Sequence, residues 1–273
     1  MNALPASDLS SAVFGDKYKH FDAKVLQGIR RETFGEDIGQ NSWLTAEEYT
    51  GFIELLKLKQ TQRILDVACG SGGPTLFLAA RLAGSVTGID IDPNAIRTAK
   101  KLAAKHELGA HLAFRLVNAD EKLPFNAARF DAIICIDAII HLPNRLEVLQ
   151  DWHRVLKRKG RILFTDSVVI TGAVSNKELA IRSSIGYFVF TPPGRDESWI
   201  EEAGFKLLLK HDVTKQMAAV SERWRKARAQ HKDALITMEG KEAYSGLQRF
   251  FSLVHKTASE RRLSRFVFLA EKQ

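Results

Sequence analysis

The segment Arg63-Ile-Leu-Asp-Val-Ala-Cys-Gly-Ser-Gly-Gly73 is the most informative part of the sequence for the fold. It begins as an apolar run of the β type, reaches Asp66, and turns through glycines into an apolar helical pattern that starts near Pro74. Glycine permits a left-handed turn and lets a ligand approach bare backbone. The free N–H groups at a helix start favour an anionic or polar ligand. The stretch therefore predicts a nucleotide-type site in a doubly wound sheet.

A second carboxylate, Asp90, ends the next apolar run, Ser85-Val-Thr-Gly-Ile-Asp90. A carboxylate there can accept both hydroxyls of a ribose. A dinucleotide fingerprint, however, expects a third glycine where Thr75 stands, and Asp66 would repel a pyrophosphate. Asp66 instead suits a ligand with an ammonium or sulfonium group. A nicotinamide-dependent dehydrogenase and a glycine turn without a ligand are the weaker alternatives.

The segment resembles the Asp/Glu-x-Gly-x-Gly-x-Gly signature of class I S-adenosylmethionine (SAM)-dependent methyltransferases, with Ala68 in place of the first glycine. The resemblance covers about residues 60–170. It implies SAM as cofactor and S-adenosylhomocysteine as product, with Asp90 on the ribose and Asp120 near the adenine amino group. The residues expected around the cofactor are Asp66, Ala68, Gly70, Gly72, Asp90, Ile91, Asp120, Glu121, Ile136, Gln40, Ser42 and Trp43.

Strand patterns alternate with helical patterns through the middle of the chain, which indicates a parallel sheet with helices on both faces. The strands are expected at 63–67, 85–90, 112–117, 130–136, 161–166, 206–212 and 263–270, and the helices at 17–34, 45–58, 74–83, 93–106, 144–157 and 198–204. We therefore predict an α/β, Rossmann-like class I methyltransferase fold. Its seven-stranded sheet is expected to be mostly parallel, with an antiparallel last strand and a helical cap.

Two units are expected along the chain. Residues 1–60, after a loose leader at 1–16, are predicted to form an N-terminal helical arm or lid. Residues 61–273 are predicted to form the SAM-binding domain, with a helical cap inserted at about 215–261. A hairpin needs only two to five linking residues, so the long insertion before the last strand indicates a cap. An ordinary interhelical loop is the alternative for the polar segment at 35–45.

The formal charge of +8 is placed unevenly. Residues 206–273 carry 15 Lys/Arg and 7 Asp/Glu, whereas the remainder is balanced. A basic region can bind nucleic acid or an acidic substrate, but it is more commonly the solvated face of helices. Cys69 and Cys135 indicate reduced thiols in a cytoplasmic protein, with no disulfide framework and no metal site. No signal peptide and no membrane-spanning stretch are recognised.

The fourth strand leads to Asp137-Ala-Ile-Ile-His141, where ligands of open α/β sheets bind. Methyl transfer is an in-line displacement, so positioning supplies most of the rate. A neutral histidine can still remove a proton from the nucleophile. We predict His141 as that base, with Asp137 holding or charging it. The alternatives are that His141 caps the next helix or contacts the cofactor.

This part of the chain, with Phe34-Gly-Glu36 ahead of the second helix, also resembles phosphoethanolamine methyltransferases and sarcosine/dimethylglycine methyltransferases. Those enzymes close N-terminal helices over small polar amines. The resemblance implies Tyr187 as a substrate-side tyrosine, Tyr18 as a gating tyrosine, and Glu36 on the substrate side. Arg182 and Arg195 are the nearest candidates for the arginine that holds a phosphate, but both fall out of register.

The sequence thus predicts a SAM-dependent methyltransferase that acts on O or N of a small organic molecule. Methylation of a nucleobase amine would predict an Asp/Asn-Pro-Pro-aromatic motif after the fourth strand, and Cys135-Ile-Asp137-Ala does not provide one. An RNA methyltransferase using the basic helix at 223–232 and a non-catalytic SAM-binding protein are the alternatives. Nucleic acid and membrane are not expected as partners, and a homodimer stays open.

Overall fold

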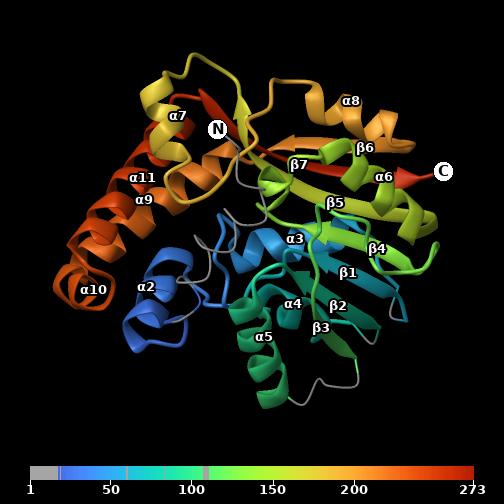
Figure 1. Cartoon of the computed structure of the whole chain (residues 1–273), viewed down its shortest axis with the longest axis horizontal. Coiled ribbons are helices and arrows are strands. Elements are labelled where there is room, and N and C mark those ends of the chain that lie inside the picture. The colour runs from blue at the N-terminus through green and yellow to red at the C-terminus, as the bar shows by residue number, and fades with distance from the viewer. Residues whose placement is uncertain (1–17, 19, 60, 83, 107–110) are drawn as a thin grey trace, which may run out of the picture.

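One seven-stranded sheet organises the computed structural model, which describes residues 18, 20–59, 61–82, 84–106 and 111–273 (Figure 1). The strand order is β3-β2-β1-β4-β5-β7-β6. The strands are β1 (Arg63–Val67), β2 (Ser85–Asp90), β3 (Leu112–Leu116), β4 (Phe130–Cys135), β5 (Leu156–Ile170), β6 (Phe205–Asp212) and β7 (Leu263–Lys272). Neighbours from β3 to β5 pair in parallel, and β7 is antiparallel to both β5 and β6. The predicted fold class is confirmed.

Helices lie on both faces of the sheet (Figure 1). They are α2 (Lys24–Phe34), α3 (Ala46–Leu55), α4 (Gly73–Ala79), α5 (Pro93–Lys105), a 3₁₀ turn η1 (Ile139–His141), α6 (Arg145–Val155), α7 (Asn176–Arg182), α8 (Arg195–Glu202), α9 (Thr214–Gln230), α10 (Lys232–Glu239) and α11 (Lys241–Ser259). Helices α4, α5 and α6 make crossover connections between the parallel strands of the sheet. Strand β5 is longer than the predicted 161–166, since its pairing with β7 continues to Ile170 and Leu263.

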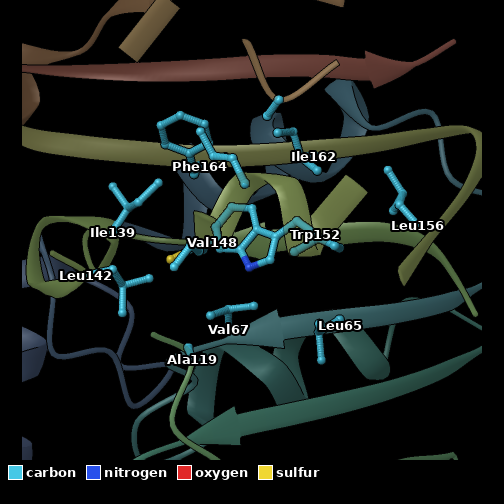
Figure 2. Close-up of a cluster of buried hydrophobic side chains, with 14 of the residues drawn as sticks. Leu65, Val67, Ala119, Ile139, Leu142, Val148, Trp152, Leu156, Ile162 and Phe164 are labelled. Atoms are coloured by element: carbon cyan, nitrogen blue, oxygen red, sulfur yellow. The ribbon is translucent and has the colours of Figure 1, made fainter. Parts of the chain in front are cut away.

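Side chains of β1 alternate between two cores, as the two-residue repeat of a strand requires. Leu65 and Val67 enter the core under α6 and α8, whereas Ile64 enters the core under α3, α4 and α5. Figure 2 shows the first core, where Trp152 of α6 packs beside Phe164 of β5. Because helices cover both faces of the sheet, a ligand-binding site is expected beyond the carboxyl ends of its parallel strands.

Helix α2 and helices α9–α11 pack together into a helical lobe beside the sheet. Ile29 of α2 packs on Ala227, Leu235 and Tyr244 of α9–α11, and Trp43 packs on Phe250 and Phe251. The long insertion before β7 is therefore helical, and the N-terminal helix lies against it (Figure 1). The predicted leader at 1–16 lies outside the described residues. Within the described ranges, no helix has the length and apolarity that crossing a membrane requires.

Candidate functional site

The glycine loop turns sharply between β1 and α4. Gly72 has φ +79°, and a Cβ built on it would lie 2.7 Å from Cβ of Ala99 and 2.8 Å from the Phe114 ring. Only glycine fits that conformation and that space. Asp90 closes the loop from the next strand, because its carboxylate accepts from the N–H groups of Gly70 (2.8 Å) and Asp92 (2.9 Å). The two sequence motifs thus meet at one edge of the sheet.

A cavity of about 190 Å³ opens at this loop. The predicted cofactor residues that line it are Asp66, Ala68, Gly70, Asp90, Ile91, Asp120, Ile136 and Ser42. Asp120 is held at the wall by Asn144, whose N–H and side-chain amide donate to its two carboxylate oxygens at 3.1 and 2.8 Å. The structure therefore brings eight predicted residues from four strand ends and the N-terminal loop around one cavity.

Four predicted cofactor residues lie elsewhere. Gly72 faces the packing of α5 and β3 rather than the cavity. Glu121 accepts from the side-chain amide of Asn118. Gln40 is buried, and its side-chain amide bridges the N–H of Ile38 and the carbonyl of Glu36, which braces the N-terminal loop. Trp43 lines a neighbouring cavity instead. These residues shape the site without lining the cofactor cavity.

The carboxylates of the cavity fit a cationic ligand. Asp66 is buried, and Oγ1 of Thr75 donates to it at 2.6 Å. Burial raises the pKa of Asp66 to about 7 and the pKa of Asp90 to about 6. The buried Tyr49 hydroxyl, which has no partner among the described residues, lines the same cavity. SAM offers a sulfonium, an ammonium and ribose hydroxyls to these groups, so the residues present fit this cofactor.

Cofactor affinity is expected to fall as the pH is lowered from 8 to 5. A bound cation lowers the pKa of Asp66 below its free value of about 7, so binding releases a proton in that range. The association constant should therefore drop by up to about tenfold per pH unit for each such carboxylate. Calorimetric titration with SAM measures it. Asp66→Asn should flatten the profile, and an unchanged pH dependence in that variant would contradict this role.

A second cavity of about 200 Å³ lies beside the first. Its wall is largely aromatic, and it lies between the N-terminal segment, α7 and the helices α9–α11. The residues that line both cavities are Asn41, Ser42, Asp137 and His141. These four residues mark the place where a group held in one cavity faces a molecule held in the other.

His141 ends η1 at this junction. Its Nδ1 lies 2.6 Å from the carbonyl oxygen of Tyr187. A carbonyl only accepts, so Nδ1 carries the proton and the neutral ring keeps its lone pair on Nε2. The His141 ring also packs against Phe188, with 4.8 Å between the ring centroids. The ring is thus oriented by main chain and packing, with Nε2 as its basic atom.

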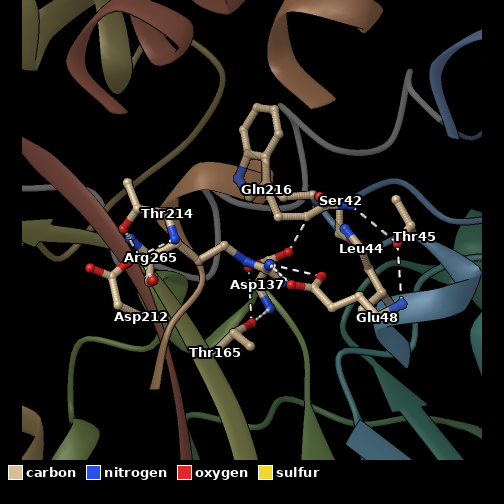
Figure 3. Close-up of polar contacts among 11 residues, drawn as sticks. Ser42, Leu44, Thr45, Glu48, Asp137, Thr165, Asp212, Thr214, Gln216 and Arg265 are labelled. Carbon is tan, nitrogen blue, oxygen red and sulfur yellow. Dashed lines mark hydrogen bonds and ion pairs between the residues drawn. The ribbon is translucent and has the colours of Figure 1, made fainter. Parts of the chain in front are cut away.

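The Asp137 carboxylate was predicted to hold or charge His141, but the contacts that it makes are with other residues. It accepts from Nε of Arg265 (2.7 Å), Oγ1 of Thr165 (2.9 Å) and the N–H of Trp43 (3.0 Å). Arg265 also binds Glu48 of α3 (Figure 3). Asp137 therefore ties the N-terminal loop to β5 and β7, and the carbonyl of Tyr187 is one of the groups that orient His141.

The four predicted substrate residues are dispersed. Tyr18 lines the cofactor cavity over Gly70, where burial and then the charge of Asp90 raise its pKa. Glu36 is exposed and lines neither cavity, and the Tyr187 side chain is 41% exposed. Arg182 is buried and lines the second cavity. Of these side chains, only that of Arg182 belongs to the second cavity.

Basic side chains of the segment 223–232, which was considered for nucleic-acid binding, contact other residues of the protein. Arg223 donates to the carbonyl of Thr33, Arg225 and Lys226 pair with Glu222, and Arg228 pairs with Glu239. These contacts hold the helical lobe together. Three arginines of α9 are therefore engaged within the protein, although the region as a whole keeps its excess of Lys/Arg over Asp/Glu.

Several residues that line the two cavities were not predicted as site residues from the sequence. Tyr49 and Asn41 line the cofactor cavity, and Trp224, Phe250 and Phe251 line the second one. Asn41 stands between two predicted residues, so its position was a usable signal. The aromatic residues sit at helical spacing, which is equally typical of a core, so sequence alone did not separate them from packing residues.

Comparison with known proteins gives matches over the same region. Residues 64–160 match the family model described as a methyltransferase domain. A phosphoethanolamine N-methyltransferase of Triticum aestivum is 28% identical over 221 residues, which cover 79% of this chain and 42% of that protein. The 27-O-demethylrifamycin SV methyltransferase of Amycolatopsis mediterranei is 27% identical over 208 residues, covering 72% of this chain and 75% of that protein.

Among solved structures, phosphoethanolamine N-methyltransferase 2 of Haemonchus contortus, in complex with phosphomonomethylethanolamine and S-adenosylhomocysteine, superposes with a TM-score of 0.81. It is 20% identical, and the match covers 99% of this chain and 60% of that chain. This similarity concerns the fold. The chain spans about half the length of several curated relatives that it matches.

Proposed function

We propose that this chain, which belongs to the class I SAM-dependent methyltransferases, transfers the methyl group of SAM to an O or N nucleophile of a small organic molecule. The observation that carries the proposal is the junction of the two cavities at Asn41, Ser42, Asp137 and His141. The first cavity suits the cofactor, and the second has room for an acceptor beside it.

Methyl transfer needs the nucleophile, the methyl carbon and the sulfur in line. SAM supplies a methyl group on a sulfonium, which is a good leaving group. Walls formed by two adjoining cavities hold the two molecules at fixed positions and exclude water. Nε2 of His141 then accepts the proton that an O–H or N–H nucleophile loses as its new bond to carbon forms. The products are the methylated acceptor and S-adenosylhomocysteine, and the proton leaves His141 to solvent.

The test is methyl transfer from SAM labelled in its methyl group. Small phenols, carboxylic acids, amines and phosphoethanolamine serve as acceptors, with mixed RNA as a further one. We expect label in a small-molecule product together with one S-adenosylhomocysteine per methyl group. Label in RNA alone would favour the nucleic-acid alternative, and binding of SAM with no transfer to any acceptor would favour a non-catalytic SAM-binding protein.

Two further properties belong to this proposal. Nucleic acid is not expected as substrate, because Arg225 and Arg228 of α9 pair with Glu222 and Glu239 and Arg223 donates to the carbonyl of Thr33 within the lobe. A reducing compartment such as the cytoplasm is proposed, because Cys69 and Cys135 are free and buried and burial raises the pKa of each thiol.

We propose in addition that the N-terminal arm and the helical cap act as a lid. Tyr18 lines the cofactor cavity, and Trp43 and Phe250 line the second cavity, so both segments form walls of the site. Closing lids exclude water and complete a catalytic site.

Binding of S-adenosylhomocysteine with an acceptor should therefore protect residues 20–45 and α9–α11 from hydrogen exchange. Strands β1 and β4 are the internal comparison, since they are already buried in the sheet. Exchange measured by mass spectrometry should show the larger gain in the two lid segments. A gain confined to the glycine loop would contradict the lid.

A further inference from the structure

The wall of the second cavity combines aromatic rings with a few charged side chains. The rings belong to Phe21, Trp43, Phe188, Trp224, Phe250 and Phe251. Trp224 stacks on Phe251 at 4.8 Å and Trp43 on Phe250 at 6.2 Å between centroids. Rings of this kind offer flat apolar surface, so the cavity suits a molecule with an aromatic or otherwise apolar body.

Most charges of this wall are paired inside the protein. Arg30 binds Asp37 at 2.8 Å, and Arg228 binds Glu239. Asp137 is engaged by Arg265. None of these groups needs an additional ion.

Arg182 is the exception among the described residues. It is 1% exposed, and no hydrogen bond or ion pair to its guanidinium occurs in the part of the chain that the structure describes. Its contacts are with rings: the guanidinium carbon lies 4.6 Å from the centroid of Phe188 and 5.1 Å from that of Phe250. Nη2 is fully buried without an acceptor.

A buried cation of this kind is costly unless it finds an anion. Burial lowers the pKa of Arg182 to about 10, so the guanidinium still carries its charge at neutral pH. The nearby carboxylates already have their own cations, since Asp137 binds Arg265 and Asp166 binds Arg145. The missing partner is therefore expected from a molecule in the cavity.

Arg182 lies close to His141, the proposed base, because both side chains contact the Phe188 ring. Phe188 lies against both side chains, with its centroid 4.6 Å from the Arg182 guanidinium and 4.8 Å from the centroid of the His141 ring. Both side chains also line the second cavity, so a molecule held there faces Arg182 with one group and His141 with another.

We propose that the methyl acceptor carries a carboxylate on an aromatic or apolar body, and that Arg182 binds the carboxylate while the body lies among the rings. The inference rests on the proposed function and adds its substrate class. A phosphate dianion fits less well, because among the described residues one guanidinium without a carboxylate partner faces the cavity, whereas a phosphate carries up to two negative charges. Arg182 thereby acts as a specificity-determining residue.

The experiment measures binding by calorimetry in the presence of S-adenosylhomocysteine, so that it does not depend on turnover. The probes are 2-naphthoate and its uncharged amide, 2-naphthamide, which differ only in the anionic group. Wild type should bind the carboxylate about 10-fold to 100-fold more tightly than the amide, as expected for a hydrogen bond to a charged group. Arg182→Met should remove this difference and leave the amide and S-adenosylhomocysteine affinities near those of wild type.

Arg225→Met is the matched control, since Arg225 pairs with Glu222 and lines neither cavity. It should keep the full preference for the carboxylate. Arg182→Lys retains a positive charge and should keep part of the preference for the carboxylate over the amide. If Arg182→Met does not fold, a reduced preference in Arg182→Lys supports the proposal and an unchanged one contradicts it.

Equal binding of the two probes by wild type, or a preference that survives Arg182→Met, would overturn the proposal. Tighter binding of phosphoethanolamine through Arg182 would overturn it in favour of a phosphobase. Loss of S-adenosylhomocysteine binding by wild type would instead count against the proposed function.

Discussion

Replacing His141 with alanine is expected to lower kcat by about 10²–10⁴-fold, while SAM affinity stays near that of wild type. The reason is the tautomer set by the Tyr187 carbonyl, which leaves Nε2 as the only proton acceptor of the ring. Steady-state rates with a phenol or carboxylic acid acceptor measure the effect. With SAM at saturating concentration at every pH, the wild-type rate should fall at acid pH, because a protonated imidazole has no lone pair, and the residual rate of the variant should lack that dependence.

Tyr187→Phe is the matched control. It keeps the main-chain carbonyl that orients His141, and the side chain it changes is 41% exposed and outside both cavities. Its turnover should stay near wild type. A folded His141→Ala enzyme with full turnover at pH 7 would eliminate the base. A loss of only a few-fold, confined to amine acceptors, would indicate a nucleophile that binds already neutral.

The architecture was predictable because its signals are local and repeat. Apolar strand runs ending in Asp66 and Asp90, separated by helical patterns, required a parallel sheet whose strand ends face one side. The glycine loop was equally readable, since Gly72 sits at a positive φ and in a space that only glycine fills. The parallel sheet and the edge at which the cofactor cavity lies follow from these short stretches.

Contacts between side chains that are far apart in the sequence could not be predicted from the sequence. Asp137 was interpreted as the partner of His141 because the two residues are four apart, yet its carboxylate binds Arg265, 128 residues away. Similarly, Trp43 was placed at the cofactor but lies against Phe250 of α11. The reason is physical: a helical period predicts which residues share a face, but not which distant helix covers it.

Replacing Arg145 with methionine is expected to destabilise the fold by about 3–5 kcal/mol. Nη1 of Arg145 binds Asp166 at 2.7 Å and Asp196 at 2.6 Å, and all three side chains are buried. Removing the guanidinium leaves two adjacent carboxylates without a cation. Nη2 also donates to the carbonyls of Ile139 and Val189, which are two residues from His141 and from Tyr187 in the sequence, so turnover should fall with stability.

Arg195→Met supplies the comparison, because Arg195 pairs with Glu202 at the surface and such pairs contribute about 0–1 kcal/mol. Burial and the neighbouring Asp166 already raise the pKa of Asp196 to about 8, and loss of Arg145 raises it further. The folded variant then binds a proton that the unfolded chain has released, so its stability rises as the pH falls. The deficit against wild type in urea unfolding should accordingly be larger above pH 9 than near pH 7, because above pH 8 the variant still holds a proton that wild type has released. A deficit no larger than that of Arg195→Met, or one that does not change with pH, would show that the two carboxylates do not depend on Arg145.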